Sequence, residues 1–549
     1  MESTKTAAEA AQPVVPLELI ESYVREHRAK GDPAAFEALL KRLLPRNAAT
    51  WVACAELLMH RELPAPAIMA LKAAQQKFPA DIELKFTLGS ALRLVGDGAS
   101  AEAVLREVLG IDPEHERAAV TLALLHRDRG QNSAAAALLR DVHRRHGGVE
   151  LTLYLVDLLR KCRREQDAMV ICEVELAHSP AHGRLQYTAG SLALTLGRFE
   201  DARSWLLASL DRSTPEVGAL LPLALTRRYN DPNDPDLARF DSVLSSPEFP
   251  ATTRSAAAFA LGKVYDDLRD YVRANQALRV ANGLRREQSN WSVSEWRNYV
   301  ERQLVNNPRP SIGAPIIDQV VPVFVVGLPR TGTTLVADLL GRHPEVKNRG
   351  ELPWLNFIAR SVEQSGQVLS LDSLRQAAVL YIAQLRQDDA QVRWYVDKNP
   401  MNFRYLGLVA ALFPNAKVIF CERNRRDTAL SIWSQSFESE DMEYAYDFDD
   451  IATFSSGHDR LMEHWQRTLP LTIHRVAYES LATSAPQVVA ELESFLGLPA
   501  YDLVNARSKD GASVNTASVW QVRQPIYTNS IGRAQAYTSL IPELQRFPG

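Results

Sequence analysis

The sequence predicts a multidomain protein, with an all-α solenoid of helical hairpins in its N-terminal half and an α/β domain with a parallel sheet in its C-terminal half. Two observations predict this architecture. Segments rich in alanine and leucine recur with a period near 34 over residues 17–285, and short apolar strands alternate with helical patterns from residue 320 onward. The length of 549 residues also exceeds that of most single domains.

The composition argues against some classes of protein. Hydrophobic residues make up 46% and charged residues 23% of the chain, as in ordinary globular proteins. The net charge of −4 gives no reason to expect nucleic acid as a partner. No apolar run approaches the roughly 20 residues of a membrane-spanning helix, so we expect no membrane span. Residues 1–16 are polar and lack the apolar stretch of a signal peptide, and we expect them to be disordered.

The cysteines point to a reducing environment. They are scattered and lack the spacing of metal ligands, at Cys54, Cys162, Cys172 and Cys421. We therefore expect buried, reduced thiols, no bound metal, and a cytoplasmic protein.

The N-terminal period is marked by proline and by pairs of small residues. Pro45, Pro79 and Pro113 are 34 residues apart, and a proline cannot continue a helix. Gly89 and Ala101 are twelve residues apart, and the same pairing recurs at Gly190 with Ala202 and at Gly262 with Ala274. A small residue on each helix of a pair lets the two helices approach closely.

This pattern resembles the tetratricopeptide repeat over residues 17–285, with degenerate units at 17–44 and from Gly262 to Asn282. The resemblance implies a concave face that binds a protein or peptide, either an acceptor or a partner. The alternative is a scaffold or dimer surface, and no pattern assigns an oligomeric state.

A domain boundary follows the repeats. Proline, glycine and asparagine cluster in residues 286–319, which we interpret as a linker to a domain spanning 320–549. Strands are expected at 321–326, 393–397, 416–421 and 471–477, and helices at 333–342, 402–413, 427–437 and 479–496. Such alternation predicts a parallel sheet with helices on both faces and a ligand at the carboxyl ends of its strands.

The first strand leads into a loop suited to an anion. The strand stops at Gly327, and Gly332 precedes a helical pattern, so that unpaired helix N–H groups point into the loop. The Gly-x4-Gly spacing is that of a nucleotide P-loop, yet Thr333 occupies the position of the phosphate-binding lysine. Arg330 supplies a cation three residues earlier.

A second group of phosphate-type ligands follows a later strand. Arg423 and Ser431 are eight residues apart and flank a turn into a helix. Arginine binds phosphate through two parallel hydrogen bonds, and a serine hydroxyl adds a donor. The alternative interpretation of this arginine cluster is a helix start that forms a salt bridge with Asp427.

Together the two segments resemble the phosphosulfate-binding loop and the 3′-phosphate site of sulfotransferases, above all the tyrosylprotein type, over about residues 320–535. The resemblance implies a P-loop-type sulfotransferase domain that uses 3′-phosphoadenosine-5′-phosphosulfate (PAPS) as co-substrate. It implies that the nucleotide is bound by Arg330, Thr331, Gly332, Thr333, Thr334, Arg423, Ser431, Tyr478, Ser518 and Arg533.

The resemblance also implies catalytic roles. Glu351 would be the base that takes the proton of the acceptor hydroxyl, while Lys398 and Arg330 would stabilise charge on the departing nucleotide. Ser518 would lie near the transferring group. No metal is expected, because a sulfuryl group carries less negative charge than a phosphoryl group.

The acceptor stays open between protein tyrosine, carbohydrate and a small molecule. Residues 438–450 hold seven acidic side chains and would repel an acidic peptide if they lined the acceptor groove. Two other functions compete with sulfuryl transfer: a repeat scaffold with an inactive nucleotide-binding domain, and a P-loop kinase-like phosphotransferase.

Overall fold

The computed structural model describes residues 47–129, 131–212, 214–305, 320–365, 370–386, 392–437, 439–506, 528 and 530–548. Several expectations therefore fall outside the described residues: the disordered stretch 1–16, the first repeat at 17–44, the linker beyond residue 305, and Ser518. The chain divides into two compact units, residues 1–158 and 159–549.

The first unit is built from helices that pair along the chain. They are α3 (Ala48–His60), α4 (Pro64–Lys77), α5 (Ile82–Leu94), α6 (Gly98–Ile111), α7 (Glu116–Asp128), α8 (Asn132–His146) and most of α9 (Val149–Lys161). Trp51 is fully buried in the core of its first helices. Pro79 and Pro113 each follow the end of a helix by two residues, as the sequence predicts.

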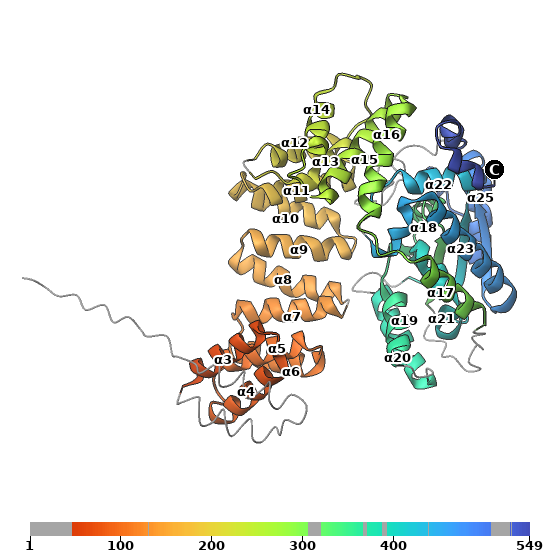
Figure 1. The fold of residues 1–549 in the computed structure, drawn as a ribbon. Helices are drawn as coiled ribbons and strands as arrows, with labels where there is room; N and C mark the ends of the chain where they lie inside the picture. Colours follow the sequence, from red (N-terminus) through yellow and green to blue (C-terminus); the bar gives the residue numbers. More distant parts are fainter. Residues whose placement is uncertain are drawn as a thin grey trace, which may run out of the picture. The chain divides into compact units, whose positions relative to one another are not determined.

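The second unit begins with further helices of the same kind. They are α10 (Glu165–His178), α11 (Gly183–Leu196), α12 (Phe199–Leu210), α13 (Leu220–Ala224), α14 (Pro235–Ser245), α15 (Ala251–Asp267) and α16 (Tyr271–Arg286) (Figure 1). The predicted helical hairpins of the N-terminal half are thus confirmed over the described residues.

The glycines that mark the repeats are sites of close helix contact. A Cβ atom on Gly89, Gly190 or Gly262 would lie 2.8, 2.6 or 2.7 Å from a leucine side chain sixteen residues later. Those leucines, Leu105, Leu206 and Leu278, come from the second helix of each hairpin. The alanines Ala101, Ala202 and Ala274 are fully buried in the same interfaces. The period in the sequence is therefore a period of helix packing.

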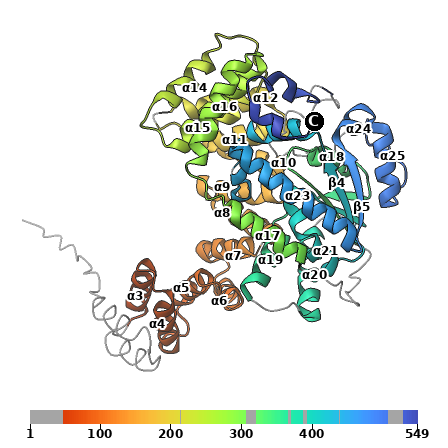
Figure 2. The same cartoon turned by 45° about the vertical axis from the view of Figure 1, so that its right-hand side comes forward.

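The segment expected as a linker contains a helix. Helix α17 (Val293–Val305) packs along α23 (Phe448–Thr468) of the C-terminal domain (Figure 2). Trp296 stacks on Phe454 with ring centroids 4.5 Å apart, and it lies close against Gly457. A large aromatic side chain that meets a glycine fixes this helix to the domain.

The C-terminal domain holds a sheet of five parallel strands, which confirms the predicted parallel sheet. The strands are β1 (Val321–Gly327), β2 (Val346–Asn348), β3 (Trp394–Asp397), β4 (Lys417–Glu422) and β5 (Thr472–Ala477), and their order is β2-β3-β1-β4-β5. Strand β2 was not predicted, because three residues are too few to show an alternating pattern.

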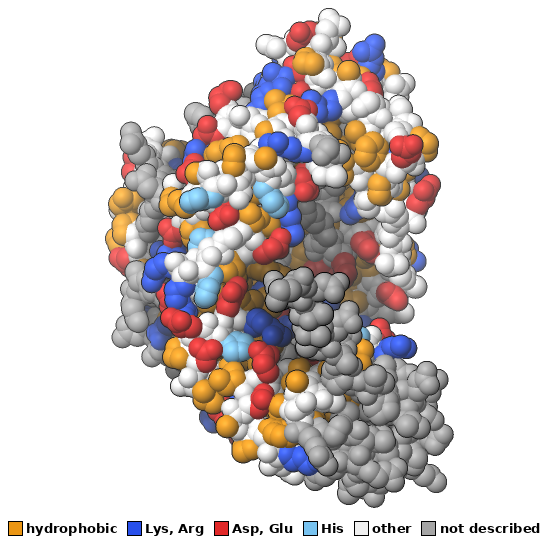
Figure 3. Space-filling model, turned by 90° about the vertical axis from the view of Figure 1, so that its left-hand side faces the viewer, with side chains coloured by type: hydrophobic (Ala, Val, Ile, Leu, Met, Phe, Trp, Pro, Cys, Tyr) orange, Lys and Arg blue, Asp and Glu red, His pale blue; other side chains and the backbone are white. Residues whose placement is uncertain are grey.

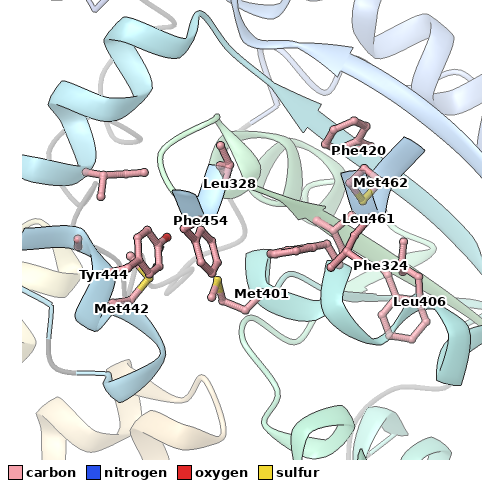
Figure 4. Close-up of a cluster of buried hydrophobic side chains, with 14 of the residues drawn as sticks. Phe324, Leu328, Met401, Leu406, Phe420, Met442, Tyr444, Phe454, Leu461 and Met462 are labelled. Atoms are coloured by element: carbon pink, nitrogen blue, oxygen red, sulfur yellow. Dashed lines mark hydrogen bonds between the residues drawn. The ribbon is translucent and has the colours of Figure 1, made fainter. Parts of the chain in front are cut away.

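Helices cover both faces of the sheet, because successive side chains of a strand point to opposite faces. Val321, Val323 and Val325 of β1 pack with α18 (Thr333–Gly341) and α25 (Ala485–Leu496). Phe324 and Val326 face a second layer that includes α20 (Leu371–Arg386), α21 (Leu406–Leu412) and α23. Figure 4 shows part of this layer, with Phe324, Met401, Leu406, Phe420, Phe454, Leu461 and Met462.

The remaining elements of the domain are short. They are α19 (Trp354–Ser365), α22 (Arg425–Trp433), α24 (Tyr478–Thr483), and the 3-10 turns η2 (Pro400–Tyr405), η3 (Glu440–Tyr446), η4 (Arg533–Tyr537) and η5 (Pro542–Arg546). The helix expected at 479–496 breaks at Ser484, because a new helix begins at Ala485 with Pro486 in its first turn. The helix expected at 402–413 is likewise two elements, η2 and α21.

Acidic and basic side chains are interspersed on the face drawn in Figure 3. This mixture agrees with the small net charge of the chain. Across the described ranges, no helix combines the length and the apolar character that a membrane crossing requires.

We predict that Gly190→Ala destabilises the second unit by about 1–3 kcal/mol, because the added methyl group would overlap the side chain and approach the backbone nitrogen of Leu206. Denaturant unfolding measures the change. Gly283→Ala is the matched control: it lies inside α16, where a Cβ meets nothing within 4 Å, and should stabilise by roughly 0.5–1 kcal/mol. Equal effects of the two substitutions would contradict the packing argument.

Candidate active site

A predicted functional residue follows each of the five strands. Arg330 follows β1, Glu351 follows β2, Lys398 follows β3, Arg423 follows β4 and Tyr478 follows β5. Because all five strands run parallel, their carboxyl ends meet at one edge of the sheet. The fold therefore gathers these side chains at that edge, although 148 residues separate the first from the last.

The loop after β1 has a conformation that only glycine permits at two positions. Gly327 has φ +150°, and a Cβ atom there would lie 2.4 Å from the carbonyl oxygen of Cys421. Gly332 has φ +92°, and its Cβ would lie 2.8 Å from the ring of Tyr478. The loop is thus pressed between the ends of β4 and β5.

The loop opens onto the N-terminus of α18. Gly332 is the N-cap of this helix and provides no side-chain acceptor for its first N–H groups. Thr333 and Thr334 occupy the first helical positions, where backbone N–H groups and the helix dipole favour an anion. Thr331 has a different task, since its buried hydroxyl donates to the carbonyl oxygen of Leu328 and closes the turn at 2.7 Å.

Arg330 connects the two predicted phosphate-binding segments. Its backbone has φ +72°, an uncommon conformation for a residue with a side chain. Its Nε donates to the Oγ of Ser431 on α22 at 3.0 Å, and its carbonyl oxygen accepts a hydrogen bond of 3.1 Å from Arg423 Nη1. Arg330, Ser431 and Arg423 therefore form one network.

Arg423 retains capacity to bind an anion. Its guanidinium lies 4.7 Å from the ring centroid of Tyr478 and donates through Nη2 to the carbonyl oxygen of Ser530 at 2.5 Å. Its Nε is buried and has no hydrogen-bond partner among the described residues. Burial lowers the pKa of this guanidinium, and the nearby charge of Arg533 acts in the same direction. An anionic ligand would satisfy the donor and offset the cost of burying the charge.

Glu351 and Lys398 form an ion pair at the other end of the site. Only 3% of the Lys398 side chain is exposed, against 50% of the Glu351 side chain. The backbone N–H of Lys398 also donates to the carbonyl oxygen of Gly350 at 2.8 Å. The lysine is thus held in place, while part of the carboxylate faces solvent.

Asp397 is a buried residue of this site to which sequence reasoning gave no role. It is 1% exposed. Its Oδ1 accepts from the N–H of Leu352 at 3.3 Å, and its Oδ2 accepts from Tyr381 Oη at 2.5 Å and from Asn402 Nδ2 at 3.0 Å. It therefore fixes the backbone next to Glu351 while preceding Lys398 in the chain. Its only signal in the sequence is its position at the end of a strand.

Asp427 also has a role that its sequence position did not reveal. Its carboxylate accepts hydrogen bonds from the N–H groups of Gly532 at 2.6 Å and Ala534 at 2.8 Å. It thereby holds the turn that carries Arg533. Arg425 of the same cluster forms an ion pair with Asp459. The printed partners of Asp427 are thus backbone N–H groups, whereas the alternative interpretation expected a salt bridge.

The acidic segment near residue 440 is occupied by structural contacts. Asp441 pairs with Arg404 at 3.0 Å, and Asp447 pairs with Arg286 of α16. Glu443 accepts a hydrogen bond from the N–H of Asn290 at 3.0 Å. Asp441 and Asp447 are thus each paired with an arginine, while Glu443 holds the backbone that follows α16. The repulsion of acidic peptides that we expect if this segment lines the acceptor groove stays a prediction.

The structure thus brings together most of the predicted site residues. Their binding and catalytic roles stay predictions. Arg533 lies on the turn held by Asp427 and pairs with Asp266 at 3.0 Å. Ser518 lies outside the described residues. Within the described ranges, no group of three or more His, Cys, Asp or Glu side chains is arranged to hold a metal ion.

Because of the buried carboxyl group of Asp397, we expect the free energy of unfolding to depend on pH. Burial raises its pKa to about 7, against the hydrogen bonds that favour the carboxylate. The folded protein therefore keeps a proton that the unfolded chain loses above its ordinary pKa of 3.8. This contribution is complete below pH 4 and is lost as the pH rises through 7.

We expect the stability of the wild type to fall relative to Asp397→Asn by roughly 2 kcal/mol between pH 5 and pH 7, at ~1.4 kcal/mol per pH unit. Urea unfolding of both proteins across this range measures the difference, in which the titration of all shared groups cancels. A difference that does not vary with pH would contradict the prediction.

Comparison with known proteins gives related chains for both halves. An uncharacterized protein of Aquifex aeolicus (strain VF5) is 32% identical over 388 residues, which cover 65% of this chain and 49% of that protein. Protein-tyrosine sulfotransferase 1 of Danio rerio is 26% identical over 200 residues, covering 33% of this chain and 54% of that protein. The chain spans about half the length of these curated relatives.

Among solved structures, the sulfotransferase domain from the Synechococcus PCC 7002 olefin synthase is similar to 43% of this chain, with 20% identity, a TM-score of 0.32 and 97% of that domain covered. The model of the sulfotransferase family matches residues 322–502. This range carries β1 to β5 and the predicted residues from Arg330 to Tyr478. The C-terminal half of this chain therefore contains a domain of the sulfotransferase family.

Proposed function

We propose that the chain is a sulfotransferase that moves a sulfuryl group from PAPS to an acceptor hydroxyl. The observation that carries the proposal is the network of Arg330, Ser431 and Arg423 beside the uncapped N-terminus of α18. The family match of residues 322–502 supports it.

The residues of this chain fit the charges of the nucleotide. The N–H groups at the start of α18 and the side chain of Arg330 would bind the 5′-phosphosulfate. Arg423 and Ser431 would bind the 3′-phosphate, and Arg423 Nε offers a donor that lacks a partner among the described residues. When bound, PAPS supplies an activated sulfuryl group on a leaving group that is already stable as an anion.

Glu351 would accept a proton from the acceptor hydroxyl. Half of its side chain is exposed, and its ion pair with Lys398 supports this role. Lys398 remains a fixed cation at the edge of the sheet, where it can stabilise negative charge on the oxygen that leaves the sulfuryl group. Arg330 provides a second cation from the loop.

We further propose that the acceptor is a tyrosine of a protein or peptide that docks on the repeats. Relatives named protein-tyrosine sulfotransferase support this acceptor. We also propose a cytoplasmic location, supported by the buried free thiols of Cys54, Cys172 and Cys421. Recovery of the protein in the membrane or extracellular fraction of its source cells would contradict that location.

We predict that the protein binds adenosine 3′,5′-bisphosphate, the desulfated product, without added metal and more tightly than ATP with magnesium. Arg423→Ala should weaken this binding by about 10–100-fold, the value of charge-assisted hydrogen bonds. Titration calorimetry measures both constants. Arg475→Ala is the control, since that exposed arginine pairs with Glu422 on the sheet. A preference for ATP with magnesium would favour a kinase-like phosphotransferase.

We predict that Glu351→Gln retains binding of the bisphosphate but lowers sulfate transfer by about 10²–10⁴-fold, because the general base is lost. Transfer of labelled sulfate to a tyrosine peptide and to proteins of a source-cell lysate measures turnover, and mass spectrometry identifies the modified residue. Glu345→Gln, an exposed carboxylate on the same segment, is the control.

Unchanged turnover in Glu351→Gln would remove that residue as the base. Nucleotide binding by the wild type without any transfer would favour the scaffold with an inactive domain. Label on carbohydrate or on a small molecule would replace tyrosine as the acceptor.

A further inference from the structure

The last repeat hairpin, α15 with α16, lies against the C-terminal segment 530–547. The carboxylate of Asp266, near the end of α15, pairs with Arg533 Nη2 at 3.0 Å and accepts a hydrogen bond of 2.6 Å from Tyr537 Oη. Tyr537 is fully buried and meets the ring of Tyr271, the first residue of α16, at 5.1 Å. One carboxylate of the repeats thus binds both ends of η4.

Helix α16 extends this contact along the segment. Asn275 Nδ2 donates to the carbonyl oxygen of Leu540 at 3.4 Å. Arg279 forms two parallel hydrogen bonds of 3.1 Å to the carboxylate of Glu543. Buried residues of this hairpin also share one hydrophobic cluster with the C-terminal domain. The hairpin is therefore packed as part of the domain.

The other side of the same segment faces the proposed nucleotide site. Ser530 accepts from Arg423 through its carbonyl oxygen, and its hydroxyl forms a hydrogen bond with Tyr478. Asp427 accepts from the N–H groups of Gly532 and Ala534. Arg533 lies between these two anchored residues, so its backbone is fixed by the domain and its side chain by the repeats.

Electrostatics explain why Arg533 needs a partner. Burial disfavours its charge, yet Asp266 raises the pKa of Arg533 above its usual value. Burial is the main cause that lowers the pKa of Arg423, and the charge of Arg533 acts in the same direction, so the two guanidinium groups repel each other. Without Asp266, Arg533 would gain from turning away from Arg423 into solvent.

We propose that Asp266 is a positioning residue of the nucleotide site: from the last repeat hairpin it holds Arg533 beside Arg423, so that two guanidinium groups face the 3′-phosphate. This inference rests on the proposed function, because it requires the bisphosphate to bind at Arg423. It makes the end of the repeats part of the nucleotide site.

The test is calorimetry of the full chain with adenosine 3′,5′-bisphosphate and with adenosine 5′-monophosphate, which lacks the 3′-phosphate. Asp266→Asn should weaken binding of the bisphosphate by about tenfold, the size of one hydrogen bond to a charged group, and leave binding of the monophosphate nearly unchanged. Asp266→Glu should restore part of the loss. In an Arg533→Ala background, Asp266→Asn should have no further effect.

Asp267→Asn is the matched control. This neighbouring carboxylate pairs with Lys263 at 2.7 Å and accepts from the N–H of Tyr229 at 3.0 Å, contacts that lie within the repeats. Equal losses of affinity for both nucleotides in Asp266→Asn would indicate a general structural effect and overturn the proposal. Tighter binding of the bisphosphate would also overturn it, because Asp266 would then compete with the nucleotide. A wild type that does not bind the bisphosphate would instead refute the proposed function.

Discussion

The position of β1 between β3 and β4, in a sheet whose strands all run parallel, is the constraint on which the site depends. Each strand delivers one polar or charged residue to the same edge, and the loop after β1, the central strand, has two strands on each side. Gly327 meets the end of β4 and Gly332 meets Tyr478 after β5. The neighbouring strands therefore determine the shape of the loop, and glycine is needed at these two positions because a side chain would not fit.

The site combines charges that are already compensated with charges that are not. Lys398 is balanced by Glu351, whereas Arg423 carries a buried Nε with no hydrogen-bond partner among the described residues. Burial of a cation without full compensation is costly, so its presence beside an uncapped helix N-terminus indicates a place prepared for an anion. Arg330 adds backbone strain at the same point, and such strain is typical of functional loops.

The repeats and the C-terminal domain do not separate where the composition changes. The sequence predicts a linker from residue 286, yet α17 lies in that segment and packs along α23. The last hairpin shares a hydrophobic cluster with the domain, and Arg286 pairs with Asp447. The acidic segment near residue 440, which suggests a repulsive surface when read alone, supplies partners for this contact. A domain boundary that is predicted from proline and glycine marks only a change in the local sequence pattern. The contacts between side chains decide which segments form one structural unit.

The sequence by itself determined the features that depend on local spacing. The 34-residue period placed the glycines and alanines of the hairpins, and the apolar runs placed four of the five strands. The motifs placed Arg330, Lys398, Arg423 and Tyr478 after predicted strands, and they singled out Glu351 without a strand before it. Only the tertiary structure revealed β2, which is too short for a pattern, and the carboxylates that hold the site together. Asp397 contacts Leu352 across 45 residues, Asp427 contacts Gly532 across 105, and Asp266 contacts Tyr537 across 271. No local periodicity encodes such partners, because a buried carboxylate is defined by the donors that folding brings to it.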